Sequence, residues 1–392
     1  MVKARSAVRC TGESHSHTGA VITRAAVLER VGAPLEVTEL ELAPPGPGEV
    51  LVRLHASGVC HSDLNAIDGT AETPCPAVLG HEGGGVVEQV GEGVTRVAVG
   101  SHVALSWAPA CGHCPECLDD LPHLCGTAWP LMAQGTLLDG TTRLSRGGEP
   151  IHHYSFLSSF AEHAVVPQAS CVPIPDDVPL DIAGLVGCAV TSGICAVWRS
   201  AAVRPGQRAA VIGCGGVGLS AVIGLAAVGA APIVAVDLDP AKLEAALSMG
   251  ATDAVEWAGS PEATAERVHE VSGGVDYAFE ATGRTEAMLT AFLSTRRRGA
   301  AVCIGIPRED AVLPLPALSI PRMERRVIGA LYGSARPDRD FLVILEQYRQ
   351  GRLPLDRLIS HRFPLDGVEE AFGLLRSGTP LRAVLDLTES AA

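Results

Sequence analysis

The sequence is short of basic charge: 30 lysine and arginine residues stand against 44 aspartate and glutamate residues, which gives a formal net charge of −14. Nucleic-acid binding needs a basic face for the phosphates, so this balance disfavours DNA or RNA as a partner. The first 20 or so residues also lack an apolar core segment, which argues against a signal peptide. We expect residues 1–22 to form a mobile N-terminal extension.

Long uncharged apolar runs are also missing, so no membrane partner is expected. The most apolar stretch, residues 209–236, is interrupted by glycines and is followed by Asp237. It is better interpreted as a strand, a turn, a helix and a second strand. With 392 residues, of which 47% are hydrophobic, the chain is large enough for two domains with well-buried cores.

Twelve cysteines would suggest disulfides in a small secreted chain, but this chain is large. Four of them lie close together, at Cys111, Cys114, Cys117 and Cys125. Thiolates so close in sequence can converge on one ion, and four satisfy the tetrahedral preference of Zn²⁺ in a closed structural site. This spacing favours a metal site and a reducing compartment, the cytoplasm.

Two patterns divide the chain. From Thr23 to Val103 short apolar runs alternate with proline and glycine, which is typical of a β-rich, partly closed domain. From Val190 onward strand-like and helix-like runs alternate, which predicts a doubly wound parallel sheet in an α/β fold. The stretch from Pro122 to Pro150 is expected to be a loop.

A glycine-rich turn follows the buried run 209–212 and opens a helix, the context that a dinucleotide-binding motif requires. The glycines permit the turn, let amides approach a pyrophosphate and allow close helix–strand packing. Asp237, nineteen residues after the motif, would accept hydrogen bonds from ribose hydroxyls and repel a 2′-phosphate, which favours NAD over NADP. Lys242 is a second candidate ribose contact. The cofactor turn is Gly213, Cys214, Gly215, Gly216, Val217 and Gly218.

With these motifs in place, the chain resembles the zinc-containing alcohol dehydrogenases of the medium-chain dehydrogenase/reductase superfamily. The matching segments run from about Thr23 to Leu387. They are G-V-C-H-S-D (58–63), G-H-E-G-G-G-V-V-E-Q-V-G-E-G-V (80–94), the four-cysteine lobe, G-C-A-V-T-S-G (187–193), G-C-G-G-V-G-L (213–219) and V-D-L-D-P-x-K (236–242).

The resemblance implies two domains with the active cleft between them. Residues 23–189 and 332–392 would form a GroES-like catalytic zinc domain that carries the structural zinc lobe at 111–125. Residues 190–331 would form the NAD-binding Rossmann domain. The long stretch 125–163 implies a homodimer formed through the edge strand of the cofactor domain.

The resemblance also assigns the site residues. Cys60, His81 and Cys188 correspond to the ligands of a catalytic zinc. Three further residues are expected to take part in catalysis. Glu82 matches an acid behind the metal, and Asp63 matches a carboxylate that orients the ligand histidine. Ser62 matches the hydroxyl that takes the substrate proton. The implied cofactor contacts beyond the glycine turn are His61, Thr191, Ser192, Ile304 and Arg382, and the implied pocket residues are Trp107, Tyr154, Ile306 and Leu331.

Two positions depart from well-known members. A proton relay that usually ends in histidine has Asn65 at that position, which cannot carry a proton near neutral pH. Glutathione-dependent formaldehyde dehydrogenases have an arginine four residues after the last structural cysteine, where this chain has Trp129. The second departure weakens a glutathione-conjugate function.

The resulting hypothesis is a zinc alcohol dehydrogenase that oxidises a primary aryl, allylic or medium-chain alcohol to its aldehyde, reversibly and with NAD. Three alternatives stay open. One is a specialised dehydrogenase for a thiol-conjugate or secondary-metabolite alcohol, including one that holds NAD permanently. The second is a lyase on the same zinc scaffold. The third is a non-enzymatic NAD-binding protein, which the retained Cys60, His81, Cys188 and Ser62 argue against.

Overall fold

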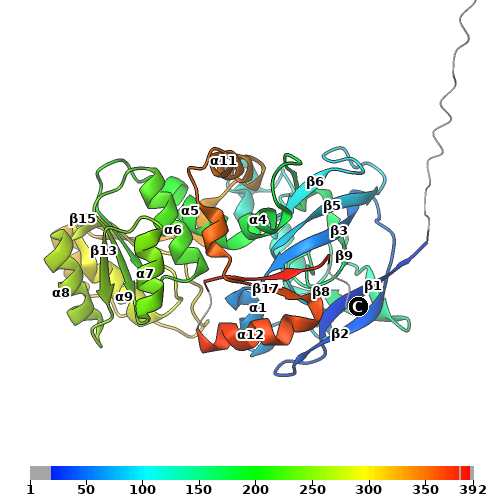
Figure 1. The fold of residues 1–392 in the computed structure, drawn as a ribbon, viewed down its shortest axis with the longest axis horizontal. Helices are drawn as coiled ribbons and strands as arrows, with labels where there is room; N and C mark the ends of the chain where they lie inside the picture. Colours follow the sequence, from blue (N-terminus) through cyan, green and yellow to red (C-terminus); the bar gives the residue numbers. More distant parts are fainter. Residues whose placement is uncertain (1–18, 379–380, 389–392) are drawn as a thin grey trace, which may run out of the picture.

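A computed structural model describes residues 19–378 and 381–388 of the chain, and most of the predicted extension 1–22 lies outside them. Two sheet regions lie side by side, a β-rich one on the right of Figure 1 and a parallel sheet flanked by helices on the left. The mixed α/β fold class predicted from the sequence is confirmed.

The β-rich region holds a closed barrel and a seven-stranded sheet. The barrel consists of β1 (Val21–Leu28), β2 (Leu35–Leu42), β7 (Leu144–Arg146), β8 (Glu149–His153) and β4 (Ala77–Val78). The sheet runs in the order β10 (Cys171–Pro173), β6 (His102–Leu105), β5 (Gly83–Val90), β3 (Glu49–Gly58), β18 (Ala383–Asp386) and β17 (His361–Pro364), and β9 (His163–Pro167) also pairs with β3.

The expectation of a loop between Pro122 and Pro150 was wrong. The segment contains a 3₁₀ turn, η1 (Pro122–Leu124), the helix α3 (Ala128–Ala133) and β7, and at its end β8 begins. β7 and β8 form a hairpin around Gly147 and Gly148, both with positive φ, and they complete the barrel. Strands this short carry too few alternating residues to stand out from a loop in the sequence.

The C-terminal segment returns to the first sheet. Strand β18 pairs antiparallel with the end of β3, so that Val384 lies opposite Gly58. It therefore reaches the part of the molecule where Cys60 follows β3. Besides α3, helices of the β-rich region are α1 (His61–Ile67), α2 (Pro115–Leu118), α11 (Pro337–Arg349) and α12 (Val368–Ser377). The short turn η2 (Gln168–Ser170) lies between β9 and β10, and η6 (Leu355–Leu358) and η7 (Leu365–Gly367) lie on either side of β17.

One continuous helix connects the two regions. It runs over Leu180–Ser200 as α4 (Leu180–Leu185), the π-helical turn η3 (Val186–Val190), α5 (Thr191–Cys195) and a second π-helical turn, η4 (Ala196–Ser200). By length and a mean hydropathy of 1.9 it could cross a membrane, but 89% of that window is buried inside the protein. Core helices of soluble proteins pass the same test.

The second region is a six-stranded sheet in which all pairings are parallel. Its strand order is β13 (Asp253–Glu256), β12 (Ile233–Asp237), β11 (Ala209–Ile212), β14 (Val275–Glu280), β15 (Thr295–Cys303) and β16 (Arg326–Gly329). The accompanying helices are α6 (Gly216–Ala227), α7 (Pro240–Ser248), α8 (Pro261–Ser272), α9 (Thr285–Ser294) and α10 (Ser319–Met323). The chain order reverses between β11 and β14, the place where doubly wound sheets bind their ligands.

The core of the β-rich region joins segments from both ends of the chain. Phe160 and Phe372 are fully buried, and their rings meet edge to face with centroids 5.9 Å apart. Phe372 lies on α12, so the C-terminal helix is packed onto the barrel side of the core.

We expect Phe372→Ala to lower the free energy of unfolding by about 3–5 kcal/mol, because it removes a buried ring and leaves a cavity. Urea unfolding followed by circular dichroism measures the loss. Leu238→Ala is the control, because Leu238 is 71% exposed; its effect should stay within about 0.5 kcal/mol. Equal losses in the two variants would contradict this packing.

Candidate metal and cofactor site

Three distant segments bring their ligand atoms together at the junction of the two regions. Cys60 follows β3 and caps α1, His81 precedes β5, and Cys188 lies in the π-helical turn η3. The ligand atoms of these three residues and of Glu82 all lie within 4.8 Å of one another. The structure thus brings together the three residues that the family resemblance implies as zinc ligands.

The carboxylate of Asp63 orients the histidine. Its Oδ1 lies 3.0 Å from Nδ1 of His81 and accepts the amide of Gly80 at 3.1 Å, and its Oδ2 accepts the amide of Cys60 at 3.2 Å. Asp63 is fully buried. A carboxylate on Nδ1 fixes the imidazole tautomer that leaves Nε2 free for a metal.

The donor set fits Zn²⁺. His81 Nε2 is buried and has no hydrogen-bond partner among the described residues, so this nitrogen is available to a metal that replaces its proton. The hydrogen bond from the Cys188 thiol, helped by the charges of Arg382 and His81, holds the pKa of Cys60 well below its usual range despite burial. Two sulfurs and one imidazole nitrogen form a three-ligand set of the kind that leaves one coordination position open.

A buried ion pair links the metal cluster to the cofactor side. The Arg382 guanidinium bonds to Oε1 of Glu82, and both side chains are almost fully buried. Glu82 Oε1 also lies 4.0 Å from Nε2 of His81. A Cβ on Gly58 would lie 1.9 Å from Oε2 of Glu82, so only glycine leaves room for this carboxylate.

The four cysteines of the lobe converge as well, with their sulfurs within 4.8 Å of one another. Amides of His113 and Cys114 and the hydroxyl of Thr127 point at Cys111 Sγ at 3.3–3.5 Å. Desolvation opposes ionisation of Cys111, but these hydrogen bonds outweigh it and lower its pKa to about 5. A cluster of thiols with one already poised as thiolate fits a closed Zn²⁺ site.

The glycine turn faces a cleft of about 370 Å³. A Cβ on Gly215 would meet nothing within 4 Å, which leaves open space for a ligand at the start of α6. The cleft is lined by His61, Lys242 and Arg382 together with Gly215 and Gly216. Two cations, Lys242 and Arg382, with the imidazole of His61 as a further polar group beside a helix N-terminus, fit an anionic pyrophosphate.

Asp237 lies at the end of β12 beside this turn. Its Oδ2 accepts the amide of Cys214 at 2.7 Å, and its Oδ1 accepts the amide of Asp239 at 3.0 Å. Of the other predicted cofactor contacts, Ile304 is buried just after β15, and Val217 is half-buried in α6. Thr191 and Ser192 follow Cys188 in the junction helix, and the hydroxyl of Thr191 donates to the Val186 carbonyl at 2.6 Å.

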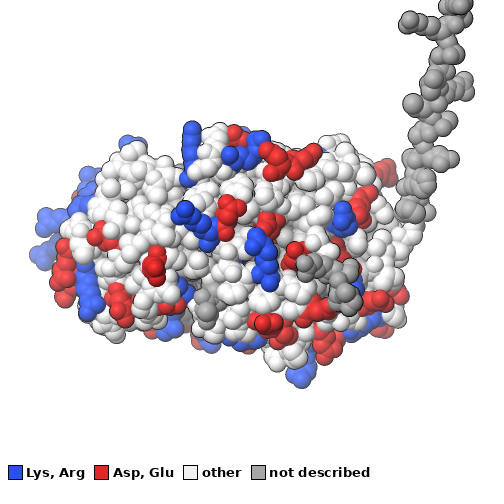
Figure 2. Space-filling model, viewed as in Figure 1, with Lys and Arg blue, Asp and Glu red and all other residues white. Residues whose placement is uncertain are grey.

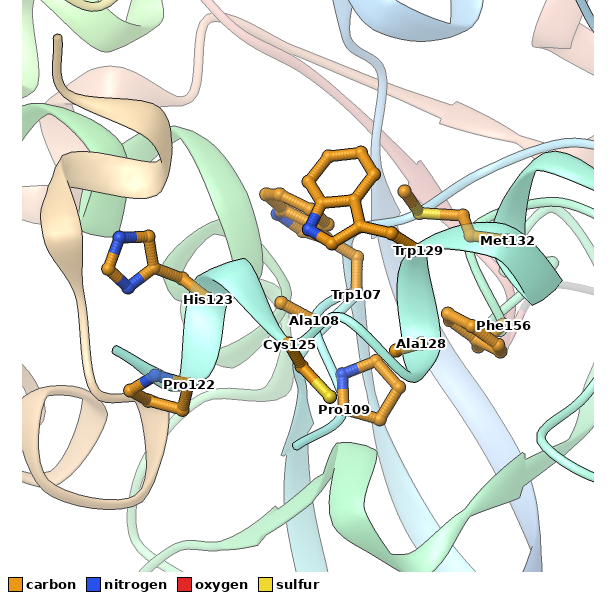
Figure 3. A pocket seen from close by; sticks show the side chains of 10 residues that line it. All are labelled: Trp107, Ala108, Pro109, Pro122, His123, Cys125, Ala128, Trp129, Met132 and Phe156. Carbon is orange, nitrogen blue, oxygen red and sulfur yellow. The ribbon is translucent and has the colours of Figure 1, made fainter. Parts of the chain in front are cut away.

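The four predicted pocket residues differ in their surroundings. Tyr154 meets the His81 ring edge-on at 5.8 Å and donates its hydroxyl to the carbonyl of Ser62 at 3.0 Å. Trp107 lines a small apolar pocket beside Cys125, and Figure 3 shows its indole behind that of Trp129. Ile306 is 61% exposed, whereas Tyr154 and Trp107 are half-buried. Leu331 is half-buried in the turn η5 (Leu331–Ser334).

The comparison with known families agrees with this architecture. Residues 46–176 match the alcohol dehydrogenase GroES-like domain, and residues 216–346 match the zinc-binding dehydrogenase domain. An S-(hydroxymethyl)glutathione dehydrogenase from Synechocystis is 36% identical over 369 residues, covering 93% of this chain and 99% of that protein. The chain belongs to the zinc-containing alcohol dehydrogenases of the medium-chain dehydrogenase/reductase superfamily, and it is an oxidoreductase of that class.

Solved structures show the same fold. An alcohol dehydrogenase zinc-binding domain protein from Burkholderia ambifaria aligns with a TM-score of 0.90 and 36% identity, covering 94% of this chain and 99% of that one. Benzyl alcohol dehydrogenase from Acinetobacter calcoaceticus aligns with a TM-score of 0.88 and 30% identity, covering 93% and 99%. These matches confirm the GroES-like and Rossmann regions predicted from the sequence.

Sequence reasoning missed two residues that touch this site. Tyr332 packs on Trp107 with ring centroids 4.5 Å apart and reaches the backbone beside Cys188. His123, buried in the lobe, lines the cavity in Figure 3. Neither belongs to a recognisable motif. The only local signal was their position, after the last parallel strand for Tyr332 and inside the four-cysteine lobe for His123.

We expect Gly218→Ala to abolish the rise in melting temperature that NAD gives the unmodified protein. An added Cβ would lie 1.8 Å from the Gly213 carbonyl oxygen, so the turn must open. Thermal unfolding with and without NAD measures the effect. Gly373→Ala is the matched control, since its Cβ would meet nothing within 4 Å. A full NAD response in Gly218→Ala would show that this turn does not hold the dinucleotide.

Proposed function

We propose that the protein is an NAD-dependent zinc alcohol dehydrogenase that interconverts a primary alcohol and its aldehyde. The observation that carries this proposal is the buried Cys60–His81–Cys188 cluster with a free imidazole nitrogen, joined through Glu82 and Arg382 to the cleft at the glycine turn. Metal ligands and a dinucleotide-binding cleft at the same junction are what hydride transfer between an alcohol and NAD requires.

When bound, zinc would supply a Lewis acid for the alcohol oxygen and NAD a hydride acceptor. Cys60, His81 and Cys188 would hold the metal, and Asp63 keeps the imidazole oriented. The Ser62 hydroxyl lies 3.9 Å from Cys60 Sγ, beside the cluster, where it can accept the proton of the alcohol. Asn65 cannot carry that proton onward, so the proton would leave through water or through the cofactor ribose.

The substrate that fits best is an apolar primary alcohol, of aryl, allylic or medium-chain type. The ring of Tyr154 stands against His81, and its hydroxyl is already bonded to the Ser62 carbonyl, so the ring presents an apolar face. Trp107 lines the nearby cavity with Trp129, Met132 and Phe156. The similarity to a benzyl alcohol dehydrogenase supports an aryl substrate.

A thiol-conjugate alcohol is the second candidate, favoured by the 36% identity to an S-(hydroxymethyl)glutathione dehydrogenase. Trp129 disfavours this substrate, because an indole offers no positive charge to a glutathione carboxylate. A zinc lyase on the same scaffold would produce no NADH. One panel decides among these: benzyl, cinnamyl and hexyl alcohols and hydroxymethylglutathione, with NAD and with NADP, followed at the nicotinamide absorbance band. The aryl proposal fails if only the glutathione adduct turns over.

We further propose a cytoplasmic homodimer with a small-molecule substrate and no nucleic-acid or membrane partner. β16 is an edge strand of the parallel sheet, and exposed apolar side chains, Val327, Ile320 and Leu318, lie on it and on or beside α10. A second copy of the chain would cover them. Figure 2 shows acidic and basic side chains interspersed over the visible face, which supports a small-molecule partner over nucleic acid. Sedimentation velocity tests the dimer.

The proposal predicts two zinc ions per chain. Cys60→Ser should retain one zinc and lower kcat/KM by about 10³-fold, because a Lewis acid stabilises the transition state by several kcal/mol. Metal analysis and steady-state kinetics measure both quantities. Cys75→Ser, at a partly exposed cysteine outside both clusters, should keep two zinc ions and full activity. A Cys60→Ser enzyme that lost its zinc but kept its rate would refute the scheme.

The preference for NAD should depend on Asp237. In Asp237→Asn the charge that repels a 2′-phosphate is gone, so the ratio of kcat/KM with NAD to that with NADP should fall about 10–100-fold. Asp253→Asn, on the neighbouring strand β13, is the control and should leave the ratio unchanged. An unchanged ratio in Asp237→Asn would mean that another group selects the cofactor.

A further inference from the structure

The backbone that carries Cys188 is irregular. Val186–Val190 forms a π-helical turn, in which the regular i→i−4 hydrogen bonds are interrupted. The two carbonyls that precede Cys188 are taken up by side-chain hydroxyls instead. Val186 accepts the hydroxyl of Thr191 at 2.6 Å, and Gly187 accepts the hydroxyl of Tyr332. Side chains therefore decide how this turn is held.

Tyr332 reaches this carbonyl from a segment that is 145 positions away in the chain. It follows β16, the last strand of the parallel sheet, and lies in the turn η5. Its side chain is 2% exposed, and its oxygen lies 3.4 Å from Oγ of Ser106, which is also buried. The only polar groups that this phenol contacts in the described part of the chain are thus Gly187 and Ser106.

The backbone of η5 is strained at this point. Tyr332, Gly333 and Ser334 have φ values of 53°, 63° and 58°, three left-handed residues in succession of which only one is glycine. Such conformations cost energy and persist where the surroundings impose them. Here the turn is pressed onto the junction helix, because a Cβ on Gly333 would lie 2.5 Å from the amide nitrogen of Ala196.

The opposite side of Gly187 is equally closed. A Cβ on Gly187 would lie 2.5 Å from the carbonyl oxygen of Leu105, at the end of β6. The peptide before Cys188 is therefore held between β6 and the Tyr332 hydroxyl. The Tyr332 ring also packs on Trp107, tilted by 41° with centroids 4.5 Å apart. One side chain thus contacts both the backbone beside a proposed metal ligand and a wall of the apolar cavity.

We propose that Tyr332 is a positioning residue for the catalytic metal site: its hydroxyl on the Gly187 carbonyl sets the direction in which Cys188 presents its sulfur. The inference rests on the proposed zinc site at Cys60, His81 and Cys188. It deepens that site by adding a group from the turn η5, and it makes the geometry of the third ligand depend on how η5 packs against the junction helix.

Tyr332→Phe tests the inference, because it removes the hydroxyl and keeps the ring on Trp107. Zinc release to a chromophoric chelator from the zinc-loaded protein is the first readout. We expect the catalytic-site zinc to be held 10–100-fold less tightly, the range for losing a group that orients a ligand, while the four-cysteine zinc is released as before. In the cobalt-substituted protein the sulfur-to-metal charge-transfer band should shift. The KM for NAD should stay within about twofold while kcat falls.

Tyr348→Phe is the matched control. It makes the same chemical change at a half-buried position of α11, where the hydroxyl donates to Asp356 at 2.7 Å, and it should match the unmodified protein in every readout. A Tyr332→Phe protein with unaltered zinc release and cobalt spectrum overturns the inference. If Tyr332→Phe does not fold, Tyr332→Leu removes the hydroxyl with another apolar side chain in its place, and unchanged zinc release in that variant overturns the inference equally.

The zinc content of the unmodified protein separates this inference from the proposed function. One zinc per chain, held by the four-cysteine lobe alone, would remove the proposed catalytic site itself. Two zinc ions, together with a Tyr332→Phe variant that behaves as the unmodified protein, would leave the dehydrogenase proposal standing and refute only the role of Tyr332.

Discussion

The carboxylate of Asp63 holds together two of the three segments that make the metal cluster. It accepts hydrogen bonds from the amides of Cys60 and Gly80 and lies against Nδ1 of His81. The ends of two neighbouring strands are therefore tied to one fully buried charge. A buried carboxylate is costly unless its oxygens are all used, and here three donors use them. The orientation of the imidazole follows from this arrangement.

The ion pair of Glu82 and Arg382 connects the metal cluster to the cofactor cleft. Arg382 stands against Gly216 at the start of α6 and bonds to Glu82 next to His81. Its Nε and the second oxygen of Glu82 have no partner within the described residues. These two buried polar atoms lie between the metal cluster and the cofactor cleft. A bound ligand could supply the hydrogen bonds that they lack. The two halves of the site therefore meet in a single ion pair.

The sequence alone predicted the parts of this protein that depend on local pattern. The strands at 209–212 and 233–237 and the cysteine spacing in the lobe could be predicted because periodicity and spacing are local properties. The convergence of Cys60, His81 and Cys188 required a family resemblance, since nothing local joins them. The hairpin of β7 and β8 was not predicted, because strands of three and five residues are too short to show the alternation of apolar and polar residues. Tyr332 escaped because its contacts are entirely tertiary.

The return of β18 to the first sheet has a consequence for how the chain is made. Arg382 is separated from its partner Glu82 by 300 positions, and β18 pairs with β3 across a similar interval. The strands of the parallel sheet lie between residues 209 and 329 and precede β17 and β18 in the chain, so the sheet beside the metal cluster lacks these two strands until residues 361–386 have been made. Contacts this distant close slowly. During synthesis, then, the strands of the dinucleotide half can pair before β18 is available to the end of β3 that leads to Cys60.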